Sequence, residues 1–242
     1  MPKKFLLLQL RDDLSAEHEV KMIKKNGDFS IKDLVVINTL RDPSKVPQPD
    51  ELTNYQGIIT GASGQYDLSC LTKTSEKKLQ KVKPIFQEII KKDIPNLAIC
   101  FGHQYIAQIM GGKVKAEKHQ AETGTYKIYL NKAGQNSPLF DGCPKSFYAV
   151  LGHKDSVTKT PKNLKKLASS TRCNLMSYQV SKNIYSVQFH PELNKDGLKW
   201  RMEQYPQYLK GTTIEKVMAK FKPTPYSKKV ISNFKKIARQ SH

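Results

Sequence analysis

The first 110 residues alternate between short apolar runs and segments with helical spacing. The apolar runs cover residues 5–10, 33–38, 57–60 and 96–99, and helical spacing covers residues 15–25, 74–92 and 101–110. Strands that alternate with helices are typical of a parallel sheet, because each parallel crossover needs a long connection. The pattern therefore predicts an α/β fold: an open, mostly parallel sheet with helices on both faces.

The pattern of apolar residues changes after residue 113. Four β-rich runs, at residues 125–130, 146–151, 164–170 and 183–189, follow one another with few helical patterns. We expect them to add further strands, some antiparallel, to the same sheet. Beyond His190 the chain is predicted to be helical, with Tyr226, Val230, Phe234 and Ile237 on one face of a terminal helix that packs on the domain. No linker or repeat interrupts residues 1–242, so a single domain is expected.

The chain is strongly basic, with 41 Lys and Arg residues against 21 Asp and Glu and a net charge of +20. Such a charge raises binding to nucleic acid or to an acidic surface as a function. However, the lysines are spread along the sequence, with no arginine-rich block and no zinc-finger spacing. A solvated, lysine-rich surface is favoured, and nucleic-acid binding is disfavoured without being excluded.

No apolar run approaches the roughly 18 residues of a transmembrane helix, and the N-terminal apolar run ends in charges without a cleavage site. The four cysteines, at 70, 100, 143 and 173, form no CxxC pair. We therefore expect a cytoplasmic protein with reduced thiols and no membrane association. His18, His119 and His242 have no partner in the pattern, so neither a metal nor a cofactor is expected.

Cys100 lies where the apolar run 96–99 meets the start of a helix at Phe101. This junction is typical of a nucleophile elbow, in which a tight turn exposes a side chain at the carboxyl end of a strand. The helix N-terminus favours a thiolate there, and Gly102 leaves room for close backbone approach. Taken alone, Cys100 is better explained as a small buried apolar residue, as most cysteines are.

His190 and Glu192 change that interpretation. His190 follows the β-rich run 183–189, and a histidine at the carboxyl end of a parallel strand would face the same edge as Cys100. Glu192 lies two residues further on, where its carboxylate can accept a hydrogen bond from the imidazole and orient it. A Cys–His–Glu triad is therefore predicted.

Several segments resemble the class I glutamine amidotransferases. These are CFGHQ at 100–104, FHPE at 189–192, ITGASGQYD at 59–67, HKDSV at 153–157 and LASS at 167–170. The chain looks like a stand-alone member similar to the glutaminase domain of GMP synthase. The resemblance implies a flavodoxin-like fold and a Cys100–His190–Glu192 triad that cleaves the γ-amide of glutamine or a γ-glutamyl compound through a thioester.

The resemblance also implies roles for other residues. Backbone N–H groups of Phe101 and of Gly61 or Ala62 would form the oxyanion hole, Gln104 would contact the substrate, and His153 would line the pocket. The sequence departs from the family where Ala98 replaces a frequent glycine and where Gly61-Ala62 replaces a Gly-Gly pair.

Three functions stay open at this point. The chain lacks a P-loop, since GASG at 61–64 is not followed by GK[ST], so ammonia from glutamine would serve a partner synthase. It would otherwise act alone on γ-glutamyl bonds, as in glutathione-like conjugates. The third interpretation is a non-catalytic basic binding protein on the same fold.

Overall fold

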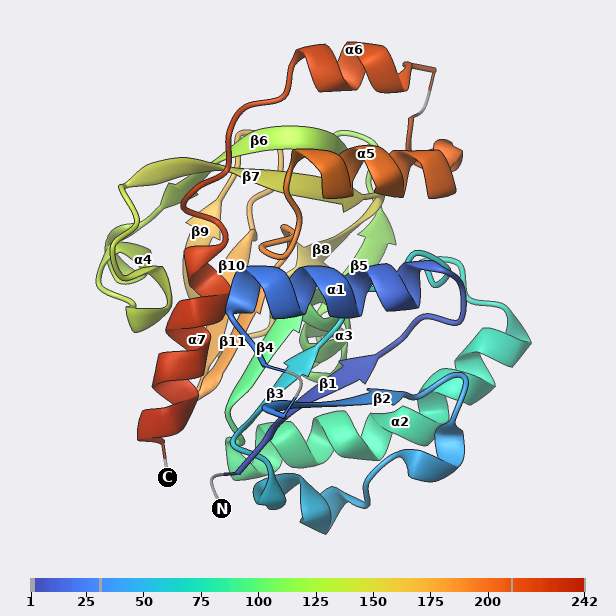
Figure 1. The fold of residues 1–242 in the computed structure, drawn as a ribbon, viewed down its shortest axis with the longest axis vertical. Coiled ribbons are helices and arrows are strands. Elements are labelled where there is room, and N and C mark those ends of the chain that lie inside the picture. Colours follow the sequence, from blue (N-terminus) through green and yellow to red (C-terminus); the bar gives the residue numbers. More distant parts are fainter. Residues whose placement is uncertain (1–2, 31, 210, 242) are drawn as a thin grey trace.

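The computed structural model describes residues 3–30, 32–209 and 211–241 (Figure 1). The strands are β1 (Phe5–Gln9), β2 (Leu34–Asn38), β3 (Gly57–Thr60), β4 (Asn96–Ile99), β5 (Lys113–Ala116), β6 (Glu122–Leu130), β7 (Ser146–His153), β8 (Asp155–Lys159), β9 (Lys165–Ser169), β10 (Ser177–Val180) and β11 (Ile184–Val187). The α-helices are α1 (Ser15–Gly27), α2 (Lys73–Lys92), α3 (Phe101–Ile109), α4 (Lys132–Gln135), α5 (Lys195–Gln204), α6 (Ile214–Ala219) and α7 (Lys229–Gln240).

In the described residues, nine strands form one sheet in the order β2-β1-β3-β4-β11-β10-β9-β6-β7. The five strands from β2 to β11 run parallel, whereas β10, β9, β6 and β7 are added antiparallel. The predicted α/β class, with a parallel sheet extended by antiparallel strands, is confirmed. The carboxyl ends of β3, β4 and β11 are neighbours in this order, so residues that follow these strands meet at one edge.

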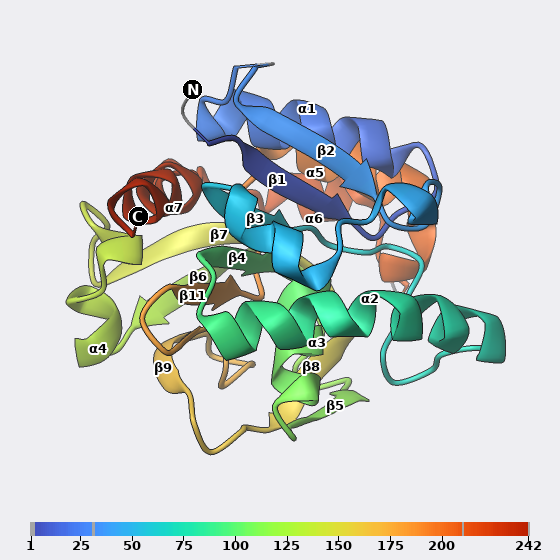
Figure 2. The same ribbon diagram turned by 90° about the horizontal axis from the view of Figure 1, so that it is seen from below.

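Helices cover both faces of the parallel strands, α1 and α7 on one face and α2 and α3 on the other (Figure 2). Successive side chains of β1 explain why both faces are covered. Phe5 and Leu7 belong to the apolar cluster that includes α7, and Leu6 and Leu8 belong to the cluster that includes α2. The first four residues of β1 are apolar and all five are buried, as is typical of a parallel strand covered on both sides.

The region after residue 113 differs from the prediction in three details. β5 and β8, which were not predicted as strands, pair with each other in a separate two-stranded sheet. β10 was not predicted, and β11 ends at Val187 rather than continuing to Phe189. Tyr226 precedes α7 and is exposed, so it does not share the helical face on which Val230 and Phe234 are buried. The helix nevertheless packs on the sheet as expected.

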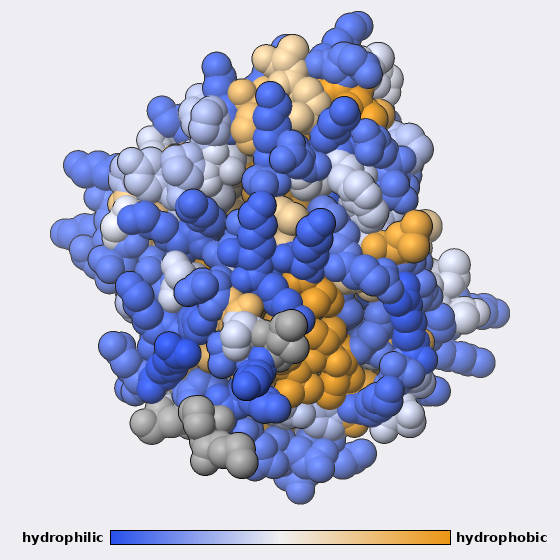
Figure 3. All heavy atoms as spheres, in the orientation of Figure 1, coloured by the Kyte–Doolittle hydropathy of each residue, from blue (hydrophilic) through white to orange (hydrophobic). Residues whose placement is uncertain are grey.

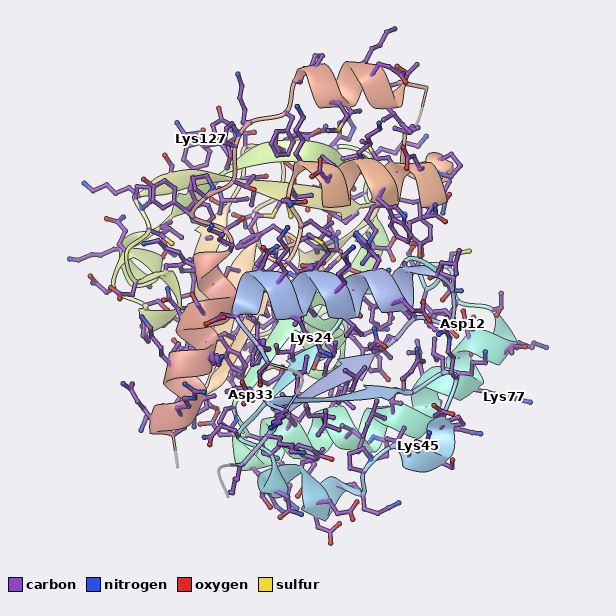
Figure 4. All side chains as sticks on the ribbon, in the orientation of Figure 1. Asp12, Lys24, Asp33, Lys45, Lys77 and Lys127 are labelled. Atoms are coloured by element: carbon purple, nitrogen blue, oxygen red, sulfur yellow. The ribbon has the colours of Figure 1, made fainter. Side chains whose placement is uncertain are left out.

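The surface is largely hydrophilic, and lysines supply much of it. Figure 3 shows a mostly blue face with a broad apolar patch below α1, in front of the β1–β2 part of the sheet, and smaller apolar areas elsewhere. Lys45, Lys77 and Lys127 are exposed on three separate elements and project away from the molecule (Figure 4). Within the described ranges, no helix is long and apolar enough to cross a membrane.

Candidate active site

Cys100 occupies a strained turn between β4 and α3. Its backbone has φ 50° and ψ −94°, which a side chain other than glycine rarely adopts. Two features fix this conformation. Cys100 N–H donates to the carbonyl of Val187 on β11 (2.8 Å), and a Cβ at Gly102 would approach the carbonyl oxygen of Thr60 to 3.0 Å. The turn therefore has the geometry of a nucleophile elbow, and Gly102 provides the close backbone approach expected of it.

His190 follows β11 and is held by β7. Its N–H donates to the carbonyl of Val150 (2.8 Å), and the two residues form an isolated antiparallel bridge. Nδ1 of His190 is 2.7 Å from Oε1 of Glu192, which is fully buried. The side chain of Asn26 on α1 donates to the Glu192 carbonyl (2.5 Å) and anchors this loop. The imidazole is thus oriented by a carboxylate two residues away.

The charges of His190 and Glu192 support each other. Burial opposes a charge on His190, but Glu192 and the hydrogen-bonded Cys100 outweigh burial and raise the pKa of His190 to about 9. Burial likewise favours a neutral Glu192, but the imidazolium holds the pKa of that carboxyl below its usual range. At neutral pH, His190 therefore carries a proton between the Cys100 sulfur and an ionised carboxylate.

Gln188 is a residue of this site that sequence reasoning missed. Its Nε2 donates to Sγ of Cys100 (3.5 Å), and its Oε1 accepts from Nε2 of Gln104 (3.0 Å). The Gln104 amide also donates to the carbonyl of Asp155 (2.8 Å). One signal was available, since residues two apart at a strand end share a face and Gln188 stands two before His190.

His153 lines the same pocket as Cys100, but its ring nitrogens are engaged in other contacts. Nδ1 is 2.9 Å from the carbonyl of Asp155, and Nε2 is 3.4 Å from Oε2 of Glu122 on β6. The residue is 3% exposed at the end of β7. It borders the pocket as predicted, and these contacts support a structural role for its ring.

The backbone N–H groups that were predicted to form the oxyanion hole differ in whether they already have a hydrogen-bond partner. Phe101 N–H forms no hydrogen bond with the described residues and stands at the N-terminus of α3. In contrast, Gly61 N–H donates to the carbonyl of Leu8 (3.0 Å), and Ala62 N–H donates to Oε1 of Glu19 (3.1 Å). Both loop donors are thus occupied in this structure, which the sequence did not predict.

Two pockets adjoin the Cys100–His190 pair. The pocket on the sulfur side, about 220 Å³, is lined by Cys100, Phe101, Gln104, Asp67, His153 and Lys154 among others. The pocket on the imidazole side, about 440 Å³ and partly open to solvent, is lined by His190, Arg11 and Arg201 among others. Ser63 and Gly152 line both pockets, so the two pockets adjoin at these residues.

Within the described part of the chain, no group of three His, Cys, Asp or Glu side chains is placed to hold a metal ion. His18, which had no partner in the sequence pattern, stacks on Trp200 with ring centroids 4.2 Å apart and lies 3.2 Å from Nε of Arg201. His242 lies outside the described residues.

Comparisons with known proteins converge on one family. The family model described as glutamine amidotransferase class-I matches residues 40–200. One of the subunits of the glutamine-hydrolysing GMP synthase of Methanosphaera stadtmanae is 35% identical over 166 residues, which are 68% of this chain and 80% of that protein. The GMP synthase of Petrotoga mobilis is 36% identical over 157 residues, 62% of this chain but 28% of that enzyme. The chain thus spans only about a quarter of that longer relative.

Solved structures show the same fold at low sequence identity. A glutamine amidotransferase from Thermotoga maritima matches with a TM-score of 0.72 and 20% identity, covering 98% of this chain and 97% of that one. A protein from Thermoplasma acidophilum, described as a GMP synthase subunit, matches with a TM-score of 0.68 and 19% identity, covering 99% and 96%. The arrangement of elements is therefore one that such proteins share.

Proposed function

Because the chain belongs to the class I glutamine amidotransferase family, we propose that it hydrolyses the side-chain amide of glutamine or of a related γ-glutamyl compound. The observation that carries this proposal is the convergence of Cys100, His190 and Glu192 at one edge of the sheet. The sulfur stands on a strained elbow, and it is hydrogen-bonded to an imidazole that a buried carboxylate orients. This constellation is that of a cysteine nucleophile with its base and orienting acid.

Before the first step, the proton of Cys100 has passed to His190, so the sulfur attacks the γ-carbonyl carbon as a thiolate beside an imidazolium. A C–S bond forms, and the C–N bond breaks as His190 returns the proton to the departing nitrogen. Glu192 stays ionised throughout, since its role is to hold the imidazolium in place. Gln188 donates to the sulfur and stabilises negative charge on it before attack.

In the second step, water hydrolyses the thioester. His190, now neutral, takes a proton from the water as it attacks the carbonyl carbon, and Cys100 leaves as the thiolate. The products are glutamate and, from glutamine, ammonia. The same residue acts as acid in the first step and base in the second, so no further titrating group is required.

The tetrahedral intermediate of each step needs donors for its oxyanion. We assign one donor to Phe101 N–H, which has no partner in the described residues and lies at a helix N-terminus. The second donor belongs to the loop after β3. Ala62 N–H serves there when it exchanges the Glu19 carboxylate for the oxyanion. Each such donor is worth about 2.7–4 kcal/mol in acyl-transfer enzymes.

The sulfur-side pocket suits the glutamyl half of the substrate. Lys154 and Asp67 border it and pair with each other (3.1 Å), and the carboxylate of Asp155 is held by Ser69 nearby. A glutamyl group carries one ammonium and one carboxylate on the same carbon. We propose that Asp67 receives the ammonium and Lys154 the carboxylate, each replacing part of the ion pair.

The names of two relatives bear on which reaction would consume the ammonia. Two relatives, from Methanosphaera stadtmanae and Methanocaldococcus jannaschii, are named as one subunit of a glutamine-hydrolysing GMP synthase. These names support glutamine as a substrate and a separate synthase subunit that consumes the ammonia. A partner would have to dock near the imidazole-side pocket, because the nitrogen leaves beside His190.

A direct test is the release of glutamate from glutamine and from γ-glutamyl amides, with Cys100→Ala as the inactive variant. Cys143→Ala is the matched control, since Cys143 follows the short helix η3 (Pro138–Phe140) and borders neither site pocket. We expect activity in wild type and Cys143→Ala, and a loss of at least about 10³-fold in Cys100→Ala. Equal inactivity of wild type and Cys100→Ala on every amide would refute the proposal.

A further inference from the structure

The imidazole-side pocket contains a buried cation that the triad does not use. Arg201 on α5 lines this pocket and is 8% exposed. Its Nε lies 3.2 Å from Nδ1 of His18, while its Nη2 is buried and has no hydrogen-bond partner among the described residues. An unpartnered guanidinium nitrogen is costly to bury, so its position calls for a ligand.

The charges of Glu19 and Glu192 favour the protonated Arg201, but no carboxylate among the described residues is hydrogen-bonded to its guanidinium. Arg11 is the other arginine of the pocket, and it already binds Oε1 of Glu19 (3.0 Å) and the hydroxyl of Ser15 (3.0 Å). Glu192, the second buried carboxylate, is committed to His190. Both buried carboxylates therefore have other hydrogen-bond partners, and neither is hydrogen-bonded to Arg201 among the described residues.

The pKa values of Arg201 and His18 agree with this arrangement. Burial, followed by the charge of Arg11, lowers the pKa of Arg201 to about 10, which leaves it protonated at neutral pH. Burial and Arg201 together lower the pKa of His18 to about 4, so His18 is neutral and accepts the Nε hydrogen bond. Arg201 therefore presents a full positive charge to the pocket.

The pocket lies where the leaving group of the reaction must go. His190 borders it and returns the proton to the departing nitrogen, so any substituent on that nitrogen extends from His190 into this space. The remaining wall is mainly apolar, with Val150, Leu193, Leu198 and Met202 around it. Ammonia has no group that would contact an apolar wall or a buried arginine, whereas an amino acid has a carboxylate for the arginine and, in most cases, a side chain for the wall.

We propose that this pocket binds the carboxylate of the leaving amine, so that the preferred substrates are γ-glutamyl amino acids or peptides rather than glutamine. The inference rests on the proposed hydrolysis at Cys100. The amide C–N bond breaks as the C–S bond forms, and the nitrogen takes its proton from His190. The amine then departs with its carboxylate held by the guanidinium of Arg201, and water converts the thioester to glutamate.

The test compares γ-glutamylglycine with γ-glutamylglycinamide, which differ only in the charge of the leaving group. For wild type, we expect kcat/KM to be roughly 10–100-fold higher for γ-glutamylglycine, the range of a charge-assisted hydrogen bond. Arg201→Met should bring the ratio of the two values close to one. Arg201→Lys should keep part of the preference, and Lys199→Met, an exposed position on the same helix, should keep all of it.

Three results would overturn the inference while leaving the proposed function standing. One is an equal kcat/KM for the two substrates in wild type. Another is an equal loss of kcat/KM for both substrates, and for glutamine, in Arg201→Met. That result would mean that Arg201 positions Glu192 or binds the carboxylate of the glutamyl half. A third is the loss of the preference in Lys199→Met, which would make it an effect of overall charge. Absence of glutamate release from all substrates would instead refute the proposed function.

Discussion

At the scale of single residues, the protonation of His190 depends on one carboxylate. Glu192 is fully buried and lies 2.7 Å from Nδ1, and no other acid is hydrogen-bonded to the imidazole among the described residues. The charge of Glu192 favours the imidazolium, which explains why the pKa of His190 rises to about 9 despite burial. Activity that needs the imidazolium to protonate the leaving nitrogen should then decline as pH rises through 9.

Replacing Glu192 by glutamine should move this decline to lower pH. The amide accepts a hydrogen bond but carries no charge, so the imidazolium loses its stabilisation and the basic limb should shift down by about 1–3 pH units. The measurement is kcat/KM for glutamate release between pH 6 and 10, with the exposed Glu17→Gln as control. Basic limbs at the same pH in wild type and Glu192→Gln would show that Glu192 does not set this ionisation.

The three triad residues were predictable because each stands within a few positions of a strand end, where local sequence fixes the direction of the side chain. Glu19 and Arg201 were not predictable in the same way. Each lies on a helix with charged neighbours, where a charged residue usually faces solvent. Tertiary packing buries both, Glu19 against Ala62 N–H and Arg201 in the imidazole-side pocket. No spacing in the sequence specifies that outcome.

At the scale of elements, Glu19 joins α1 to β1 and to the loop after β3. Its carboxylate accepts from Arg11 and Gln9 as well as from Ala62 N–H. Glu19→Ala would leave Arg11 buried without its anion, so we expect the free energy of unfolding to fall by about 3–5 kcal/mol.

Urea denaturation checks this expectation. The matched control is Glu17→Ala on the same helix, whose partner Arg41 is on the surface, and its midpoint should stay close to that of wild type. A Glu19→Ala midpoint equal to that of Glu17→Ala would mean that water replaces the buried pair at no cost.

The terminal helix α7 should contribute substantially to stability. Phe234 is fully buried and contacts Phe5 edge-on with ring centroids 6.4 Å apart. Phe234→Ala should therefore lower the free energy of unfolding by about 3–5 kcal/mol, since it removes a buried ring and leaves a cavity. Thermal or urea unfolding measures the loss, and the exposed Lys236→Ala on the same helix is the control. Equal stability of the two variants would indicate that α7 does not unfold together with the sheet.

Some strands were predicted from the sequence with the correct bounds, and others were missed. β3 and β4 match their predicted bounds, because a short run that is largely apolar has few alternatives between two polar loops. β10, with the sequence SYQV, was missed, since two polar residues in four give no apolar run. β5 and β8 carry polar residues at most positions, and their separate pairing depends on α3 and the β7 end rather than on their own pattern.

At the scale of the whole molecule, the lysines and arginines behind the charge of +20 are spread along the sequence. The exposed Lys45, Lys77 and Lys127 belong to η1 (Pro43–Lys45), α2 and β6, which lie in different parts of the structure (Figure 4). Spread charge attracts polyanions without selecting a sequence, because only phosphates are contacted.

Binding to RNA should consequently be weak and dominated by salt. We expect a dissociation constant of about 10⁻⁴–10⁻⁶ M for random-sequence RNA near physiological salt, and a loss of several orders of magnitude in affinity between about 50 and 200 mM salt. Fluorescence anisotropy with labelled RNA of two unrelated sequences gives both quantities, and Cys100→Ala should bind like wild type because Cys100 is buried. Nanomolar binding that persists at 200 mM salt and distinguishes the two sequences would contradict this expectation. Together with an unreactive Cys100, it would favour a binding protein on an amidotransferase fold.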